Sequence, residues 1–222
     1  MKCLYHGIEC ASQITDAILV MFSGGKDSVC VLDLCHRYFR RVQPVFMQIG
    51  PMLSFHKAMH AWAEDKYGVE ILKLPHPGVV DCLRYGVFRN YQDFSIPVIT
   101  FKDIWNYSRL QTGIWWIAAG EKIADSIVRR AMIKGDGGCV NAKIGRFYPL
   151  AEWTIKDVYA YMRQRRLRMT PEYESYGGSY NGSLVPHSLH WLKRHYPNDY
   201  EKMRAWFPFI DVATKRIEFF GE

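Results

Sequence analysis

The stretch Ala17–Ser28, which reads AILVMFSGGKDS, decides the fold of this chain. Its first six residues form a continuous apolar run, which is typical of a strand buried in a parallel sheet. A short loop rich in glycine follows. Beyond that loop, residues 28–38 place Val29, Leu32 and Leu34 at the spacing of a helix. The stretch therefore predicts a strand, a tight loop and a helix in succession.

The chemistry of that loop favours an anion as its ligand. Two consecutive glycines let the backbone turn tightly and approach a ligand without a Cβ in the way. The start of the helix turns free N–H groups and its positive dipole end towards the loop. Lys26 adds a charge, the serine hydroxyls can donate, and Asp27 either holds Mg²⁺, orients a water molecule or caps the helix. The spacing differs from a Walker loop, so we expect another kind of phosphate loop, formed by Ser23, Gly24, Gly25, Lys26, Asp27 and Ser28.

The rest of the chain continues to alternate between strand and helix patterns. Further strands are predicted at residues 44–49, 69–74 and 114–118, and further helices at 55–67, 124–132 and 154–165. Thr154 is expected to cap the last of these helices. This alternation predicts an α/β fold with a doubly wound, mostly parallel sheet.

The domain organisation follows from the same patterns. We expect residues 1–180 to form a nucleotide-binding domain and residues 181–222 to form a small helical C-terminal extension of it. Two helices are predicted there, at 189–195 and 199–206, with a break at Pro197 and Asn198. Between the strands, we expect helix plus loop at 79–97, a short helix start at 101–104 and a flexible glycine loop at 135–138.

Composition and charge narrow the class of protein. With 222 residues, 49% of them hydrophobic and 23% charged, the chain is ordinary for a soluble globular protein. No stretch approaches the roughly 18 apolar residues of a membrane helix, and the first residues lack the apolar run of a signal peptide. We therefore expect a cytoplasmic protein without a membrane partner.

A formal net charge of +7 suits an anionic ligand, which is a nucleotide, a nucleic acid or both. One basic cluster is either a solvated helix end or a contact to a phosphate backbone; it consists of Arg163, Arg165, Arg166 and Arg168.

Three segments together resemble one known family. The loop SGGKDS after an apolar strand looks like the PP-loop of the adenine nucleotide α-hydrolase superfamily. Residues 120–130, GEKIADSIVRR, resemble the G-x-R-x-x-E-S-x-x-R-R segment of its phosphoadenosine phosphosulfate reductase branch. Residues 148–161, YPLAEWTIKDVYAY, resemble that branch's P-L-x-x-W-T-x-x-D-V-x-x-Y segment. A further P-x-Y…G match begins at Pro171, so the resemblance covers roughly residues 15–180.

The chain departs from this family at its cysteines. Members with an iron–sulfur cluster carry a Cys-Cys pair before the P-L segment and a later C-x-x-C. Here Cys139 alone remains of the first pair, and residues 181–186 contain no cysteine. No cysteine follows Cys139, so the reductases' nucleophile near the C-terminus is also missing. Because a cluster needs about four thiolates, we predict none. The family's D-T-G is also altered, to Gln48-Ile49-Gly50.

The resemblance implies an enzyme that cleaves ATP between the α- and β-phosphates and adenylylates an acceptor for sulfur transfer. Mg²⁺ would assist, held by Asp27, and similar proteins serve DNA phosphorothioation beside a cysteine desulfurase. Two alternatives stay open: a reductase-like protein that binds phosphoadenosine phosphosulfate, and a nucleotide-binding subunit without chemistry. The expected catalytic residues are Lys26, Asp27, Arg129 and Arg130. Beyond the loop, the expected nucleotide-binding residues are Met47, Gly120, Lys122, Asp125, Ser126 and Arg129.

Overall fold

The part of the chain that the structure describes forms a sheet of six strands, and one of the four strand pairings given below is antiparallel. The computed structural model describes residues 5–172 and 184–221. The strand order is β3-β2-β1-β4-β6-β5. Strand β1 pairs in parallel with β2 and β4, β4 pairs in parallel with β6, and β5 runs antiparallel to β6. The strands are β1 (Ala17–Met21), β2 (Arg41–Gln48), β3 (Leu72–Pro75), β4 (Ile117–Ala118), β5 (Val140–Asn141) and β6 (Arg146–Phe147).

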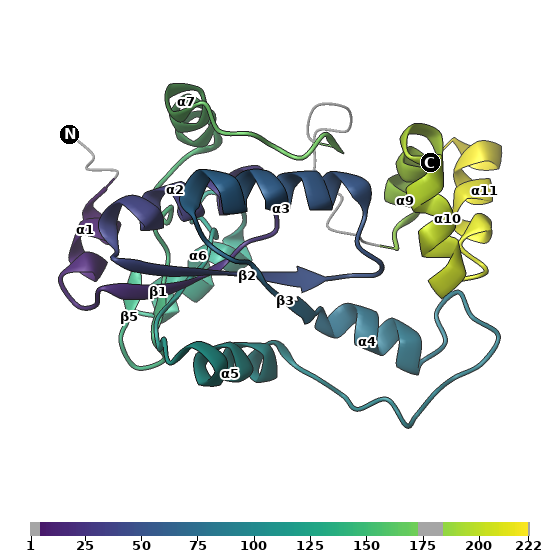
Figure 1. Ribbon diagram of the computed structural model, residues 1–222, viewed down its shortest axis with the longest axis horizontal. Coiled ribbons are helices and arrows are strands. Elements are labelled where there is room, and N and C mark those ends of the chain that lie inside the picture. Colours follow the sequence, from purple (N-terminus) through teal and green to yellow (C-terminus); the bar gives the residue numbers. More distant parts are fainter. Residues whose placement is uncertain (1–4, 173–183, 222) are drawn as a thin grey trace. The chain divides into compact units, whose positions relative to one another are not determined.

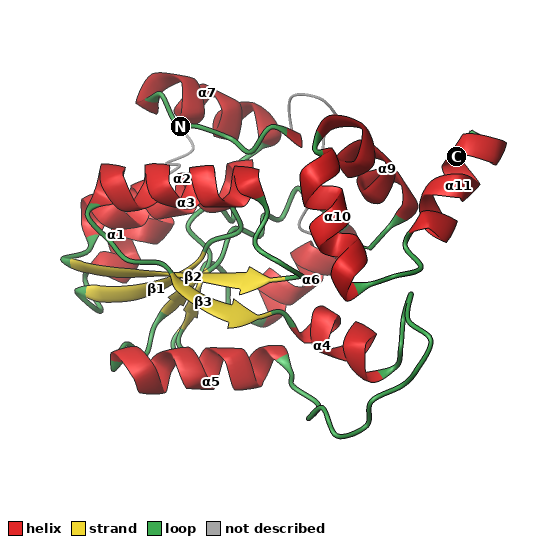
Figure 2. Cartoon of the chain, turned by 45° about the vertical axis from the view of Figure 1, so that its right-hand side comes forward, coloured by secondary structure: helices red, strands yellow, loops and turns green. Residues whose placement is uncertain are grey.

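Helices flank this sheet, with α2 on one face and α5 on the other (Figures 1 and 2). The described helices of the first half of the chain are α1 (His6–Ser12), α2 (Lys26–Tyr38), α3 (Ser54–Tyr67), α4 (Pro77–Arg84) and α5 (Phe101–Thr112). Those of the second half are α6 (Ile127–Gly135), α7 (Ile155–Arg165), α9 (Pro186–His195), α10 (Pro197–Trp206) and α11 (Asp211–Phe220). The α/β fold with a mostly parallel sheet is confirmed.

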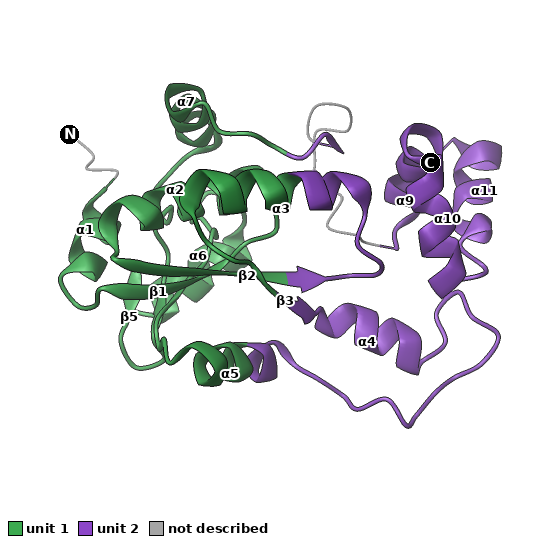
Figure 3. Cartoon of the chain, in the orientation of Figure 1, with its two compact units in different colours: residues 1–46, 59–72, 105–169 green, residues 47–58, 73–104, 170–222 purple. Residues whose placement is uncertain are grey.

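The chain divides into two compact units, each of which has its own core (Figure 3). Unit 1 comprises residues 1–46, 59–72 and 105–169, and unit 2 comprises residues 47–58, 73–104 and 170–222. The interior of unit 1 contains the buried side chains of β1 and α2, including Leu19, Val20 and Leu32. The division predicted at residue 180 falls in 173–183, outside the described residues, so it stays a prediction.

Unit 2 is held by an apolar cluster and one buried carboxylate. Leu53 and Phe55 pack with the C-terminal helices through Leu192, Met203 and Phe207. The carboxylate of Asp199 accepts hydrogen bonds from the backbone N–H of Ser54, at 2.7 Å, and from its hydroxyl, at 2.6 Å. Ser54 and Asp199 come from distant parts of the chain, so the predicted C-terminal helices do not form a core of their own. They belong to a core that also includes α4.

Several predicted boundaries were wrong for local reasons. Helix α2 begins at Lys26 rather than Ser28, because Gly25 already occupies the cap position. The strand predicted at 114–118 contains only Ile117 and Ala118. Helix α6 begins after Ser126, whose hydroxyl accepts from the N–H of Arg129, and it runs on to Gly135. Proline is well suited to the first turn of a helix, so the break predicted at Pro197 and Asn198 lies at Tyr196, and Pro197 is already the first residue of α10.

Candidate functional site

The loop between β1 and α2 is held in shape by its own serines. The Ser28 hydroxyl donates to the carbonyl oxygen of Gly25 at 2.9 Å and accepts from the N–H of Ser23 at 3.2 Å. The Ser23 hydroxyl in turn accepts from the N–H of Gly25 at 3.4 Å. Gly24 has a φ of 77°, in the left-handed region that glycine adopts without strain. The serine hydroxyls expected to donate to a ligand therefore also fix the loop.

This loop lies at the point in the sheet where the strand order reverses. Strand β1 is paired on one side with β2, the next strand in sequence, and on the other with β4. In open α/β sheets, ligands bind outside the carboxyl ends of the strands at such a reversal. The loop after β1 and the segment after β4, residues 119–126, both leave those carboxyl ends. Both belong to unit 1.

Four charged side chains join these two segments. The ammonium group of Lys26 lies 2.7 Å from Oδ2 of Asp27. The ammonium group of Lys122 lies 2.8 Å from Oδ1 of Asp27 and 2.9 Å from Oδ1 of Asp125. The backbone N–H of Lys122 also donates to Oδ2 of Asp125, at 2.9 Å. Two ammonium groups and two carboxylates make this four-residue charge cluster neutral.

The charge cluster varies strongly in exposure. The side chain of Lys122 is 3% exposed, whereas that of Asp125 is 37% exposed. Lys26 and Asp27 lie between these extremes, at 16% and 23%. A buried ammonium ion is costly unless it is paired, so the position of Lys122 depends on both carboxylates.

Gly120 lets the two segments approach each other. A Cβ on this residue would lie 3.2 Å from Cβ of Asp27 and 3.6 Å from the backbone nitrogen of Ser28. Those distances are tighter than, or close to, ordinary van der Waals contact. A side chain at position 120 would therefore press on the first turn of α2.

The two predicted arginines of α6 differ in their contacts. Arg129 forms an ion pair with Oε1 of Glu121, at 2.8 Å, and Arg146 approaches the same oxygen at 3.5 Å. Arg129 is thereby linked to the segment that follows β4. Arg130 is exposed on α6. Neither Glu121 nor Arg146 was predicted as a site residue, although Glu121 stands inside the segment 120–130 that resembles the known family.

Arg146 also belongs to an aromatic environment. Its guanidinium carbon lies 4.7 Å from the ring centre of Trp105 and 5.2 Å from that of Tyr148. Such cation–π contacts and the Glu121 ion pair fix the guanidinium in place. No pattern in the sequence distinguishes this arginine from a solvated one, because its partners come from separate segments.

The nucleotide-binding roles predicted for Met47 and Ser126 stay predictions. Met47 belongs to unit 2, and its expected part in nucleotide binding stays a prediction. Ser126 caps α6 with its hydroxyl, which accepts from the N–H of Arg129 at 3.1 Å. Its role towards a nucleotide is likewise untested.

The thiol of Cys30, which closely follows the phosphate loop in sequence, has low reactivity. Cys30 lies on α2 and is buried. Burial, followed by the nearby carboxylates of Asp27 and Asp33, raises the pKa of the Cys30 thiol well above its usual value. Because the thiolate is the nucleophilic form, Cys30 is not suited to attack a ligand.

Residues 5–172 and 184–221 contain neither a metal-binding cluster nor a membrane-spanning helix. Within those ranges, no three His, Cys, Asp or Glu side chains gather in a way that could hold a metal ion. Among the helices described there, none combines the length and apolar character needed to cross a membrane. A single carboxylate such as Asp27 is compatible with Mg²⁺ only where substrate phosphates supply other ligands.

Comparison with known proteins identifies the fold. No protein-family model and no curated protein matches this chain. Among solved structures, phosphoadenylyl-sulfate reductase from Candida auris, in a phosphate complex, aligns with a TM-score of 0.53 and 11% identity, covering 78% of this chain and 84% of that one. The NH3-dependent NAD synthetase from Campylobacter jejuni, in complex with nitrate, aligns with a TM-score of 0.51 and 14% identity, covering 100% and 97%. At these identities the likeness establishes a shared fold.

Proposed function

We propose that this chain, which has the fold of the PP-loop adenine nucleotide α-hydrolases, is an enzyme that binds ATP and cleaves it between the α- and β-phosphates. An oxygen of the acceptor attacks the α-phosphorus, and the bond from that phosphorus to the bridging oxygen of the β-phosphate breaks. Pyrophosphate leaves, and the acceptor carries the adenylyl group. The terminal sulfur of a persulfide on the sulfur donor then attacks the acceptor and displaces adenosine monophosphate, and a thiol reductant cleaves the resulting disulfide bond, so that one sulfur atom stays on the acceptor.

The observation that carries this proposal is the meeting of two segments at the reversal of strand order. The phosphate loop and residues 119–126 both follow parallel strands, and the Lys122–Asp27 ion pair of 2.8 Å joins them. This is the position at which α/β sheets bind ligands. The loop chemistry of glycines, a helix start and Lys26 suits phosphates in particular.

In the proposed reaction, the chain's own groups stabilise the leaving group. The backbone N–H groups at the start of α2 and the ammonium group of Lys26 would bear on the negative charge that develops on pyrophosphate. Arg129, held by Glu121 at 2.8 Å, would add a guanidinium from α6. Arg130 is proposed to assist from the same helix. Gly120, Asp125 and Ser126 would shape the opposite wall of the nucleotide site.

Asp27 is the proposed contact for Mg²⁺. When bound with the nucleotide, Mg²⁺ would neutralise charge on the transferred and leaving phosphates. The residues fit this role in part, since a carboxylate oxygen is a ligand that Mg²⁺ accepts. Both oxygens of Asp27 lie within 2.8 Å of a lysine ammonium group, so the ion would have to share this carboxylate with them.

The acceptor is proposed to be a nucleic acid, with DNA phosphorothioation as the specific case and a cysteine desulfurase as the sulfur donor. Residues 126–169 contain ten Lys and Arg against three Asp and Glu, an excess equal to the +7 of the whole chain. This concentration of charge in one segment favours a polyanionic partner. We also propose that no iron–sulfur cluster takes part, because Cys139 is the last cysteine of the sequence. Iron analysis of the purified protein tests that point.

The test of the proposed function is release of pyrophosphate. The protein is incubated with ATP labelled in the α-phosphate, with and without duplex DNA, and the products are separated by chromatography. Labelled adenosine monophosphate or an adenylylated acceptor, together with pyrophosphate, supports the proposal. A parallel incubation with phosphoadenosine phosphosulfate and a reductant examines the reductase-like alternative. Tight nucleotide binding without any product would instead favour a non-catalytic subunit.

A further inference from the structure

We propose that Lys122 is a positioning residue that neutralises Asp27 and so allows Lys26 to turn from Asp27 to the phosphates of the ligand. This inference rests on the proposed function, because it concerns the same phosphate loop. It assigns to Lys122 a role other than direct contact with the nucleotide. The argument starts from the ion pairs of the charge cluster.

In this structure the charge of Lys26 is balanced by Asp27. Their ammonium and carboxylate groups lie 2.7 Å apart. A phosphate must compete with that carboxylate for Lys26. If Lys26 moved to the phosphates, Asp27 would remain as a negative charge close to a polyphosphate, and the repulsion would oppose binding.

Lys122 removes that obstacle. Its ammonium group is 2.8 Å from the other oxygen of Asp27, and its side chain is 3% exposed. A buried ion pair is screened far less by water and salt than an exposed one. Asp27 therefore keeps a counter-ion after Lys26 has moved. Asp125, at 2.9 Å, holds Lys122 from the opposite side.

Burial also prevents Lys122 from replacing Lys26. With its ammonium group between two carboxylates and its side chain 3% exposed, Lys122 is fixed, whereas the side chain of Lys26 is 16% exposed. The two lysines thus have different tasks. Lys26 is the mobile charge for the ligand, and Lys122 is the fixed charge for Asp27.

The experiment is a double-mutant cycle on binding of pyrophosphate in EDTA, which keeps metal ions out of the measurement. Isothermal titration calorimetry compares the wild type with Lys122→Met, Asp27→Asn and the double variant. Lys122→Met should weaken binding by about tenfold or more, because the carboxylate of Asp27 would then repel the ligand without a fixed counter-ion. Asp27→Asn should bind at least as tightly as the wild type. The double variant should match Asp27→Asn within about twofold, because no charge is left to neutralise.

The controls separate positioning from folding. Lys122→Arg keeps the charge and should bind within about threefold of the wild type, while Lys156→Met removes an exposed lysine of α7 and should have no effect. If Lys122→Met does not fold, Lys122→Arg and the double variant decide the matter. A double variant as weak as Lys122→Met, or a Lys122→Met variant with unchanged affinity, overturns the inference. A wild type that binds neither ATP nor pyrophosphate overturns the proposed function as well.

Discussion

Helix α2 carries two aspartates whose surroundings differ in kind. Asp27 stands in its first turn, is 23% exposed and is paired with the ammonium groups of Lys26 and Lys122. Asp33 stands further along the same helix and is 1% exposed. It accepts hydrogen bonds from the hydroxyls of Tyr67, at 3.0 Å, and Tyr161, at 2.6 Å.

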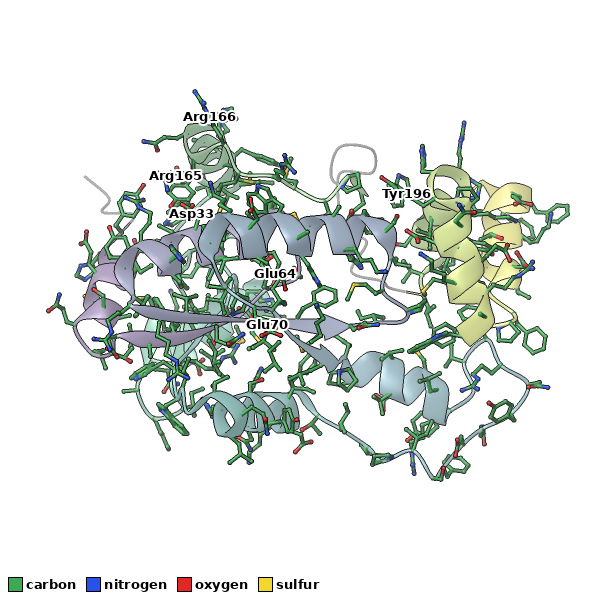
Figure 4. The ribbon with its side chains drawn as sticks, viewed as in Figure 1. Asp33, Glu64, Glu70, Arg165, Arg166 and Tyr196 are labelled. Atoms are coloured by element: carbon green, nitrogen blue, oxygen red, sulfur yellow. The ribbon has the colours of Figure 1, made fainter. Side chains whose placement is uncertain are left out.

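A guanidinium completes the surroundings of Asp33. Arg165 donates to it through Nε at 2.9 Å, from the end of α7 (Figure 4). Burial alone would raise the pKa of the Asp33 carboxyl, but the hydrogen bonds from Arg165, Tyr161 and Tyr67 hold that pKa below its usual value. The buried Asp33 therefore accepts from three donors, whereas Asp27 is paired with two ammonium groups, of which that of Lys26 is on the more exposed side chain. We therefore propose that Asp33 stabilises the fold and that Asp27 acts at the ligand site.

The largest effect is expected at Lys26, where the rate of pyrophosphate release rather than stability should change. Lys26→Ala should lower the rate of pyrophosphate release by about 10²–10³-fold, the usual scale for removing one donor that stabilises transition-state charge. Stability should change little, because the Lys122–Asp27 pair remains. Initial rates with ATP, beside urea unfolding curves, measure both quantities. Lys156→Ala serves as the matched exposed lysine. Unchanged turnover in folded Lys26→Ala would remove the loop from the mechanism.

The next largest effect is expected at Asp33, where stability rather than nucleotide turnover should change. Asp33→Asn should lower the free energy of unfolding by about 2–4 kcal/mol, because two tyrosine hydroxyls and a guanidinium lose a charged acceptor. Nucleotide affinity of the folded protein should stay within about twofold. Urea denaturation and calorimetry check this, with Asp16→Asn as control, since that side chain is 73% exposed. A stable Asp33→Asn protein with weakened nucleotide binding would reverse the assignment of the two aspartates.

The fold was largely predictable because its signals are local. The apolar run before Ser23 and the two glycines indicate β1, the loop and the presence of α2 without reference to the rest of the chain. The short strands β5 and β6 were missed, since two residues show no periodicity. Helix α1 was missed for a similar reason, because it has only seven residues. Helix α11 was also missed, and its exposed Phe219 and Phe220 obscure the amphipathic pattern.

The charge cluster was only partly predictable. Lys122 and Asp125 were expected at a nucleotide site through a family segment, not through their pairing. Nothing in the sequence indicates that Lys122 is buried, because its partner Asp27 lies far away along the chain and meets it only when β1 and β4 pair. The same holds for Asp33, whose donors come from α3 and α7.

A smaller effect should appear in acid. The pKa of the Asp33 carboxyl is lowered in the folded protein, chiefly through its hydrogen bonds to Arg165, Tyr161 and Tyr67. Its contribution is therefore fully present above the unfolded pKa and is lost as the pH falls through the folded pKa. The stability difference between the wild type and Asp33→Asn should be constant near neutral pH and shrink below about pH 4. Urea unfolding at a series of pH values measures it. A difference that persists unchanged to about pH 2 would contradict the role of the carboxylate charge.

The smallest effect concerns the basic cluster at the end of α7, in which one arginine is bound to Asp33. Arg165 is bound to this carboxylate, whereas Arg163, Arg166 and Arg168 are exposed. If DNA is the acceptor, changing the three exposed arginines to Gln should flatten the log–log dependence of affinity on salt by about 0.9 for each phosphate that the variant no longer neutralises. Arg165→Gln should change that slope less and lower stability instead, because its guanidinium serves Asp33. Fluorescence anisotropy with a labelled duplex over a salt series measures the slope. Equal slopes for all variants would exclude this end of α7 from DNA binding, and a wild type without affinity at low salt would favour a small-molecule acceptor.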